Sequence, residues 1–397
     1  MDILFNDIKH ILSIQIKPRH DGIFDQYSRI FMPKILLLSS IAVGVNWYVD
    51  KLTCTKSENI EFSSEFINEA CWINGFYIYK NMTNRMTTYY GIPEDITRDG
   101  LKKDGSLCTV TRRSDCIPME KLYYIQYQWF PFFIASLMIL YFIPYTAFKI
   151  VNTDLISLKN AIKTQTSDDV FCTYFNKSLN STLRVRCKIF INFAIKIAYI
   201  FSNVATLLLI DYILNGGYLS YARNWFRWTE KTGSSMLDYS KYRSTFRAGE
   251  ILLPSFGLCD IQEQWMDKTN LKNNKHKFIC EFSAHVLYHY VLILLWFFVV
   301  FGIISSALGL FFHATTYLLI ILPFAKHSKK TGSVLKALTL REQEYLEYIH
   351  SQNTPLYGLI INKLRQERFK DSSNVSIEIL KQQVLELSNQ LHKINRG

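Results

Sequence analysis

Four apolar stretches constrain this chain more than any other feature, because each is long enough to cross the hydrocarbon core of a bilayer as a helix of about 20 residues. Hydrophobic residues make up 49% of the 397-residue chain and aromatic residues 15%, a composition that fits a membrane protein with long polar segments. The predicted spans are residues 31–50, 127–151, 189–214 and 285–312. The sequence therefore predicts a mostly α-helical membrane protein built on a four-transmembrane-helix bundle.

The distribution of charge predicts which side of the membrane each connecting segment occupies. Residues 1–30, 152–188 and 313–397 together carry a larger excess of Lys and Arg than the loops 51–126 and 215–284. By the positive-inside rule, both termini and the middle loop are cytoplasmic and the two long loops are extracellular. Acidic and basic residues interrupt the first 20 residues, so we expect no cleavable signal peptide, and the first span acts as an uncleaved anchor.

The cysteines support the same orientation. Disulfides form on the oxidising, extracellular side of the membrane, whereas cytoplasmic thiols stay reduced. Cys172 and Cys187 lie in the middle loop and are expected to be reduced. No CxxC pair is present, so a zinc site is the less favoured interpretation of the remaining cysteines. These are Cys54, Cys71, Cys108 and Cys116 in the first loop, and Cys259 and Cys280 in the second.

No motif for catalysis or cofactor binding stands out. The chain has no GxSxG, GxxxxGK[ST] or HExxH motif and no pair of carboxylates within a span. His285 and His289 have the i, i+4 spacing of many metal ligands, but no third ligand has a fixed spacing, so no metal is predicted. The net charge of +12 is dispersed rather than grouped on one helix, which disfavours nucleic-acid binding. We expect neither an enzyme nor a cofactor.

Three regions outside the loops leave alternatives open. Residues Met1 to Pro18 have the pattern of an amphipathic helix, which either lies on the inner membrane surface or folds into a pore. The third span carries a polar stripe that faces either another helix or a pore. Residues 377–394 have a 3,4-spaced apolar seam that pairs with another helix or packs within the subunit. The polar stripe consists of Asn192, Lys196, Tyr199, Asn203 and Thr206.

Several motifs resemble those of the innexins, the invertebrate gap-junction proteins. The segment QYQWFPF begins the second span: Tyr127 and Trp129 are predicted to be membrane-interface aromatics, and Pro131 lies early in the helix, where its missing N–H costs little. Together with Gln128, these residues resemble the innexin signature YYQWVPF. CWINGFY in the first loop, LPSFGLCD in the second and LLWFF in the fourth span also resemble innexin motifs, as does the lead-in RHDGIFDQYSR. The chain departs from the family pattern at HVLYHY, at Leu253 and by its extra Cys108 and Cys116.

The resemblance implies a gap-junction channel subunit in the plasma membrane, at cell junctions. Its ring, homomeric or mixed with related subunits, would dock onto a ring of the neighbouring cell and pass ions and small metabolites. The fold it implies has a disulfide-bonded extracellular domain formed by the two loops, and a helical cytoplasmic domain. A non-junctional hemichannel and a non-conducting adhesion or scaffold protein are the alternatives.

The resemblance also implies roles for individual residues. Cys54 would pair with Cys280, and Cys71 with Cys259; a third bridge between Cys108 and Cys116 is predicted only from their spacing and compartment. Asn81 is the acceptor of the sequon NMT, at which a glycan would obstruct docking. The N-terminal segment would fold into the pore and bring to it Asp2, Asn6, Asp7, Lys9 and His10.

Overall fold

The computed structural model describes residues 23–49, 52–56, 62–85, 87–108, 116–176, 182–232, 248–267, 270–321 and 338–367. The chain divides into two compact units. We call the first the loop unit; its described residues fall within Tyr27–Phe142 and Ile200–Ser305. We call the second the tail unit; its described residues fall within 23–26, Ile143–Tyr199 and 306–367.

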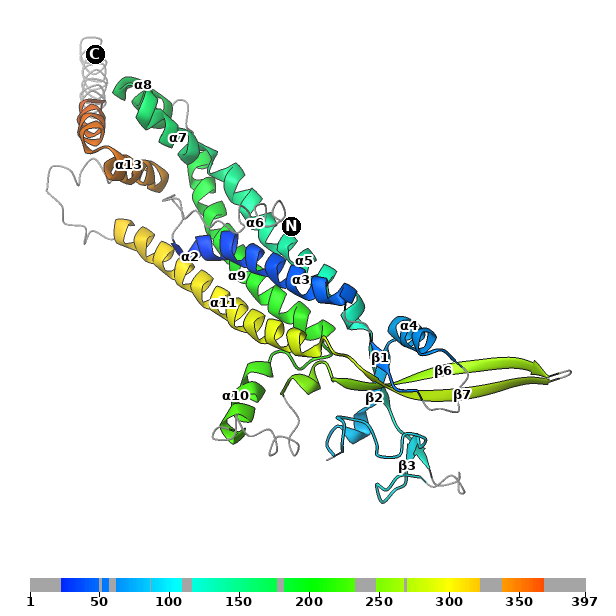
Figure 1. Cartoon of the computed structure of the whole chain (residues 1–397). Helices are drawn as coiled ribbons and strands as arrows, with labels where there is room; N and C mark the ends of the chain where they lie inside the picture. Colours follow the sequence, from blue (N-terminus) through cyan, green and yellow to red (C-terminus); the bar gives the residue numbers. More distant parts are fainter. Residues whose placement is uncertain are drawn as a thin grey trace, which may run out of the picture. The chain divides into compact units, whose positions relative to one another are not determined.

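Four helical segments are long and apolar enough to cross a membrane, which confirms the predicted four-span fold (Figure 1). They are Phe24–Val45, Phe130–Val151, Cys187–Ile213 and His285–Thr315. The helices that build them are α2 (Ile23–Gln26), the π-helix η1 (Tyr27–Phe31), α3 (Met32–Val49), α5 (Phe130–Ser136), α6 (Met138–Val151), α9 (Thr182–Ile213) and α11 (His285–Ile321).

The observed helices differ from the predicted spans mainly at their ends. The first span begins at Phe24 rather than at the predicted residue 31. The prediction placed its start too late because the polar residues Asp25 and Arg29 interrupt the apolar pattern there. Helix α11 continues beyond residue 312 to Ile321, and Pro323 follows shortly after. Proline lacks the N–H that a helix interior requires, so this end agrees with the sequence.

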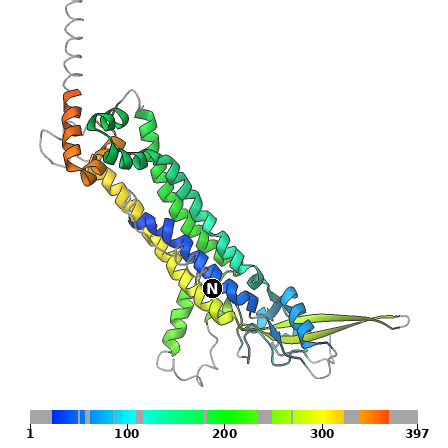
Figure 2. The same cartoon turned by 45° about the horizontal axis from the view of Figure 1, so that its top comes forward.

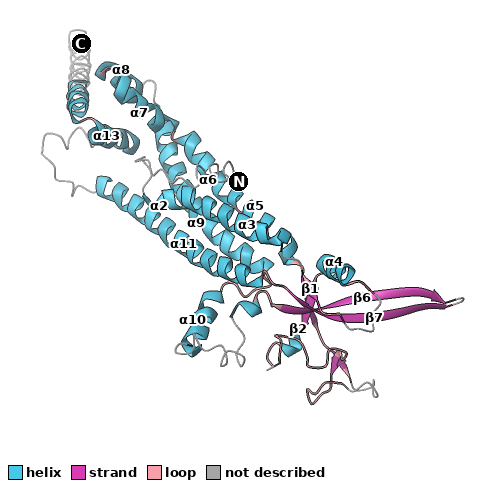
Figure 3. Ribbon diagram, viewed as in Figure 1, coloured by secondary structure: helices cyan, strands magenta, loops and turns pink. Residues whose placement is uncertain are grey.

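The two long loops form one antiparallel β-sheet with the strand order β1-β7-β6-β2-β5 (Figure 3). The first loop supplies β1 (Thr53–Cys54), β2 (Phe76–Tyr79) and β5 (Lys121–Tyr124), while the second supplies β6 (Phe256–Asp267) and β7 (Asn270–Glu281). Register pairs Cys54 with Cys280 and Tyr77 with Leu258, so each loop is paired with the other twice. All four residues of β2 are buried, which makes this strand the centre of the loop core.

Short elements complete the loop unit. Helix α4 (Ser64–Asn74) is capped by Ser63, whose side chain accepts the N–H of Phe66. A two-stranded sheet joins β3 (Gly100–Leu101) to β4 (Ile117–Pro118). The remaining elements are η2 (Lys80–Met82), η3 (Gln126–Gln128), α10 (Tyr221–Thr232) and η5 (Ala248–Ile251).

The described part of the tail unit is helical. It contains α7 (Thr153–Thr164), α8 (Ser167–Tyr174) and α13 (Leu340–Gln352), with a core that includes Leu158 and Ile349, both fully buried. Figure 2 gives a second view, with α7 and α8 in green and α13 in orange. The apolar seam predicted for residues 377–394 lies outside the described residues.

Candidate functional site

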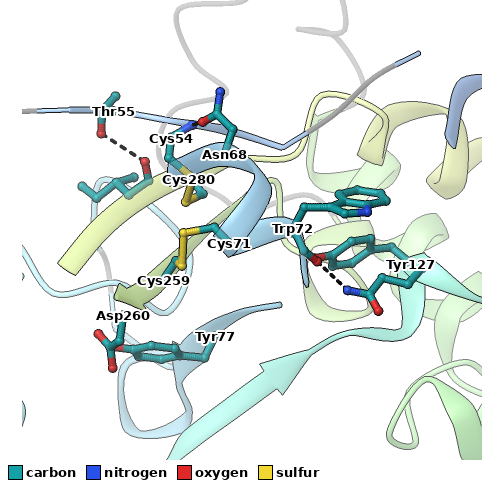
Figure 4. Close-up of a disulfide and its surroundings, with 12 residues drawn as sticks. Cys54, Thr55, Asn68, Cys71, Trp72, Tyr77, Tyr127, Cys259, Asp260 and Cys280 are labelled. Atoms are coloured by element: carbon teal, nitrogen blue, oxygen red, sulfur yellow. Dashed lines mark hydrogen bonds between the residues drawn. A yellow bond between two sulfur atoms is a disulfide. The ribbon is translucent and has the colours of Figure 1, made fainter. Parts of the chain in front are cut away.

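The six loop cysteines lie in three disulfides, two of which connect the two loops (Figure 4). Cys54 on β1 bonds to Cys280 on β7, with a Cα–Cα distance of 3.9 Å, and the sheet register already places these two residues opposite each other. Cys71 on α4 bonds to Cys259 on β6 at a Cα–Cα distance of 5.8 Å, so a helix of the first loop is fixed to a strand of the second. These are the pairs that the resemblance implies.

The third disulfide lies within the first loop. Cys108 bonds to Cys116, eight residues further along the chain, at a Cα–Cα distance of 5.9 Å. Gly100 lies against this bridge, because a Cβ atom built on Gly100 would be 2.1 Å from the Cys116 Sγ. The bridge therefore packs tightly on β3 rather than hanging from an open loop.

The sulfur atoms of Cys54, Cys71 and Cys280 lie within 4.8 Å of one another. This proximity follows from two adjacent disulfides, and a disulfide sulfur is not the thiolate that binds zinc. Cys172 and Cys187, the two cysteines of the middle segment, are free and exposed.

Charged side chains reinforce the sheet next to the disulfides. Asp260 accepts a hydrogen bond from the Tyr77 hydroxyl at 2.7 Å and forms ion pairs with Lys121 at 2.6 Å and Lys275 at 2.9 Å. Burial acts to raise the pKa of Asp260, but the hydrogen bonds from Lys121, Lys275 and Tyr77 outweigh it and hold that pKa below its usual value. The ionised carboxylate thus connects β2, β5, β6 and β7.

A second carboxylate does the same one step along the sheet. Asp99 pairs with Lys277 of β7 and accepts a hydrogen bond from the hydroxyl of Tyr79 on β2. Burial raises the pKa of Tyr79 above its usual range, since the phenolate would be poorly solvated, and the Asp99 carboxylate adds to this shift. The two networks fix the register between strands from both loops.

The QYQWFPF segment connects this sheet to the second span. Tyr127 is only 1% exposed, stacks on Phe76 with ring centroids 5.6 Å apart and donates its hydroxyl to the Trp72 carbonyl at 2.9 Å. Gln128 donates to the carbonyls of Trp72 and Ile73 at the end of α4. The prediction that Tyr127 is a membrane-interface aromatic is therefore wrong, because the side chain belongs to the loop core.

The rest of the segment fits its predicted position at the start of a span. Trp129 is 39% exposed, as expected of an interfacial aromatic, and Pro131 lies in the first turn of α5, where its missing N–H costs little. The segment thus holds the second span against α4, which carries Cys71.

The histidines with metal-ligand spacing are held by backbone carbonyls. The Nδ1 of His285 lies 2.6 Å from the Phe282 carbonyl oxygen, and the Nε2 of His289 lies 2.8 Å from that of Leu253. His289 is buried against Gly249, where even a Cβ atom would clash with the imidazole ring. These contacts give both rings a structural role at the start of α11.

The polar stripe of the third span makes helix contacts in both units. In the loop unit, Asn203 is fully buried, accepts the Tyr141 hydroxyl at 2.9 Å and donates to the Ser28 hydroxyl at 3.0 Å. Gly302 leaves room for it, since a Cβ there would approach the Asn203 Oδ1 to 2.5 Å. Of the two predicted alternatives, these contacts favour helix contact, because buried polar groups in a membrane require such partners.

In the tail unit, two further positions of the stripe are paired. The side chains of Asn192 and Asn152 exchange hydrogen bonds of 2.9 and 3.1 Å. Lys196 forms an ion pair with Asp25 of α2, and both side chains are nearly buried, at 14% and 10% exposed. The sequence did not indicate Asp25 as a partner, because this residue precedes the predicted first span.

A comparison with protein-family models identifies the fold that this geometry builds. The model described as Innexin matches residues 21–374 of the 397. The chain belongs to the innexin family. Innexins are channel proteins of the gap-junction and hemichannel type that assemble as oligomers and are multi-pass proteins of plasma-membrane junctions. No curated protein matches the chain significantly.

This innexin also contains, in the tail unit, an ion network that no sequence pattern predicted. Arg341 of α13 is fully buried and binds Asp154 at 2.8 Å, Glu344 at 2.6 Å and the Asn152 side-chain oxygen at 2.8 Å. Burial acts to raise the pKa of Asp154, yet its bonds to Arg341, among others, lower that pKa to about 2. An Arg in a capped, amphipathic helix carries no sequence signal of burial, so only the fold reveals this role.

The remaining predicted residues are less constrained by the structure. Asp2, Asn6, Asp7, Lys9 and His10 lie outside the described residues. Asn81 is exposed in η2, and its side-chain oxygen accepts the N–H of Glu120 at 3.1 Å.

Proposed function

We propose that this innexin is a subunit of a gap-junction channel whose rings dock across the space between two cells and pass ions and small metabolites. The observation that carries the proposal is the loop unit, in which two disulfides bind both loops into one sheet. A surface that docks onto another ring must keep its shape before contact, because ordering flexible loops on binding would cost affinity. The ion networks of Asp260 and Asp99 serve the same purpose.

The proposal includes an orientation. The disulfide-bonded loops face the outside, and both termini lie in the cytoplasm together with helices α7, α8 and α13 of the tail unit. The excess of Lys and Arg in the terminal and middle segments supports this orientation, and so does the contrast between three loop disulfides and the free Cys172 and Cys187. The N-terminal segment, with Asp7 and Lys9, would line the pore and filter ions by charge.

Electrical recording from paired cells tests the channel and its docking. Cells that lack other junction proteins would each express the full chain, and a current that passes from one cell to the other is the expected result. The double variant Cys71→Ser/Cys259→Ser should reach the cell surface in smaller amounts and give no junctional current. The double variant Cys172→Ser/Cys187→Ser is the matched control and should behave like the parent chain, because both thiols are free and exposed.

Three outcomes separate the proposed function from its alternatives. Junctional current supports the proposal. Current across the surface of single cells without current between cells would favour a non-junctional hemichannel. Normal surface expression with neither current would contradict a channel and favour a non-conducting adhesion or scaffold protein.

One observation favours the hemichannel as a second candidate. Asn81 is exposed and followed by Met82 and Thr83, so it presents a complete glycosylation sequon on the loop unit. A bulky glycan there would separate two docking rings. If the glycan is present, Asn81→Gln should increase junctional current and remove a glycosidase-sensitive mass. Unchanged junctional current, with surface current intact, would show that the site has no part in docking.

A further inference from the structure

Helix α10 follows the third span and has two chemically different faces. One face packs onto the loop unit: Tyr221 is 1% exposed and donates its hydroxyl to the His289 carbonyl at 3.2 Å, while Trp225 lies 6.1 Å from Tyr290, measured between ring centroids. These contacts join the start of α10 to the start of α11. Packing within the subunit therefore explains the aromatic residues on this face of the helix.

The opposite face of α10 is exposed and carries both charges and an aromatic ring. Arg223 and Arg227 are exposed and stand one helical turn apart, with Glu230 on the same side. Phe226 lies beside them, is 58% exposed and contacts Phe297 of α11 edge-on, with ring centroids 6.1 Å apart. An exposed Phe next to two Arg residues is not explained by packing within the subunit.

The contact with Phe297 gives the depth of α10 relative to the fourth span. The candidate span His285–Thr315 has 31 residues and is therefore about 46 Å long at a rise of about 1.5 Å per residue, whereas the hydrocarbon core is about 30 Å thick. A core centred on this span begins about five residues into the helix, near Tyr290. Phe297 lies beyond that boundary, so the Phe226 ring that touches it is at the level of the acyl chains.

The surroundings and direction of α10 agree with this depth. Tyr290, Leu294, Phe297 and Phe301 form an exposed apolar stripe along α11, with 54%, 54%, 42% and 56% exposure, as expected of a lipid-facing surface. In both Figure 1 and Figure 2, α10 runs across the direction of α11 rather than alongside it. A helix that crosses the spans at the edge of the hydrocarbon core lies in the plane of the bilayer surface.

We propose that α10 is a membrane-interface helix that binds phospholipid: Arg223 and Arg227 bind the headgroup phosphate, and Phe226 inserts among the acyl chains. Among the side chains that the structure describes, the exposed face carries two positive charges and one negative charge, and a zwitterionic headgroup offers the complementary phosphate and ammonium groups. Arginine binds phosphate in two-point geometry, which suits it better than lysine to this role. The interface helix also marks the membrane level at which the loop unit stands.

Depth-dependent fluorescence quenching tests the proposal in the full chain. A background with Cys172→Ser and Cys187→Ser removes the free thiols, and Phe226→Cys then accepts an environment-sensitive fluorophore. The protein would be reconstituted in phosphatidylcholine vesicles that contain lipids with a nitroxide near the headgroup or deep in the acyl chain. Ile73→Cys is the matched control, because Ile73, like Phe226, is an exposed apolar residue; it is 68% exposed on α4.

We expect the label at residue 226 to be quenched at least threefold more than the label at 73, by the acyl-chain nitroxide as well as by the headgroup nitroxide. Adding Arg223→Ala and Arg227→Ala should reduce this quenching toward the control value. Equal quenching at 226 and 73 would overturn the proposal. A blue-shifted but unquenched label would also overturn it, because a neighbouring subunit rather than lipid would then cover the helix.

A second labelling position guards against a folding defect of the Phe226 variant. Glu230 is exposed and is not one of the two phosphate-binding residues, so Glu230→Cys should leave packing unchanged, and its label should be quenched more strongly by the headgroup nitroxide than by the acyl-chain nitroxide. Assembly of each variant, checked by size-exclusion chromatography, shows whether the protein tested is intact. An intact Glu230→Cys variant without headgroup quenching would contradict the proposal by itself.

Discussion

The ion pair between Asp25 and Lys196 gives the sharpest prediction about stability. Its two side chains are 10% and 14% exposed, and Gly309 lies close enough that a Cβ there would be 3.0 Å from the Asp25 Oδ1. Removal of one partner leaves the other charge buried without compensation, which typically costs about 3–5 kcal/mol. We therefore expect Asp25→Asn and Lys196→Met each to lower the free energy of unfolding of the tail unit by about that amount.

The double variant distinguishes loss of a favourable interaction from exposure of an orphan charge. Asp25→Leu/Lys196→Met removes both charges, and replacing a buried ion pair by apolar side chains is often neutral. It should regain most of the stability that either single variant loses. Thermal unfolding of purified protein in detergent, followed by size-exclusion chromatography, measures this through the midpoint temperature.

A surface pair provides the matched control for this experiment. Lys80 and Glu120 lie 3.1 Å apart, but their side chains are 63% and 66% exposed. Such pairs contribute about 0–1 kcal/mol, so Glu120→Gln should hardly change the midpoint. The reasoning fails if Asp25→Asn destabilises no more than Glu120→Gln, or if the double variant at the buried pair is as unstable as the singles.

Three further perturbations follow from the structure. The pKa of Asp154 is lowered to about 2, so its contribution of about 2 kcal/mol should be present above about pH 4 and disappear as the pH falls toward 2. Arg341→Met should reduce that pH dependence in acid-unfolding curves without removing it, because Tyr345 and Lys188 also lower this pKa. Loss of the Cys71–Cys259 bridge should lower the free energy of unfolding by about 4 kcal/mol. The two inter-loop disulfides span 188 and 226 residues, so when one is already formed the other closes only the 38-residue difference. Loss of the Cys108–Cys116 bridge, which spans eight residues, should cost about 2.5 kcal/mol, and denaturant titration under oxidising conditions measures both costs. Gly302→Val should lower the unfolding temperature, at a cost of about 1–3 kcal/mol, because the new side chain overlaps a buried asparagine; a midpoint equal to that of the parent would contradict this packing.

The features that the sequence revealed are those with a strong local signal. A run of about 20 apolar residues is itself the requirement for a membrane span, so all four spans were found. The polar stripe around Asn203 was found because its 3,4 spacing shows on a single helix. Such local patterns can be recognised without knowing which residues pack against the helix.

The features that were missed depend on residues far apart in the chain. Asp25 pairs with Lys196, which lies 171 positions away in the chain, and Arg341 pairs with Asp154, which lies 187 positions away. Tyrosine is an amphipathic residue typical of membrane interfaces, and only the fold shows that Trp72 and Phe76 pack against Tyr127. An ionisable or aromatic residue can satisfy its chemistry in several surroundings, and the sequence alone does not choose between them.

Noncovalent contacts, among them the Asp25 ion pair, hold the start of the first span, whereas a disulfide holds the chain just beyond its end. Near its start, Ser28 accepts a hydrogen bond from Asn203 in the loop unit, whereas just beyond its end Cys54 is bonded covalently to Cys280. A hydrogen bond contributes about 1 kcal/mol and can open thermally, but a disulfide cannot. Ser28→Ala should therefore change the fraction of time that the channel is open while leaving docking intact. Single-channel recording with unchanged open probability would show that the start of this span does not move during gating.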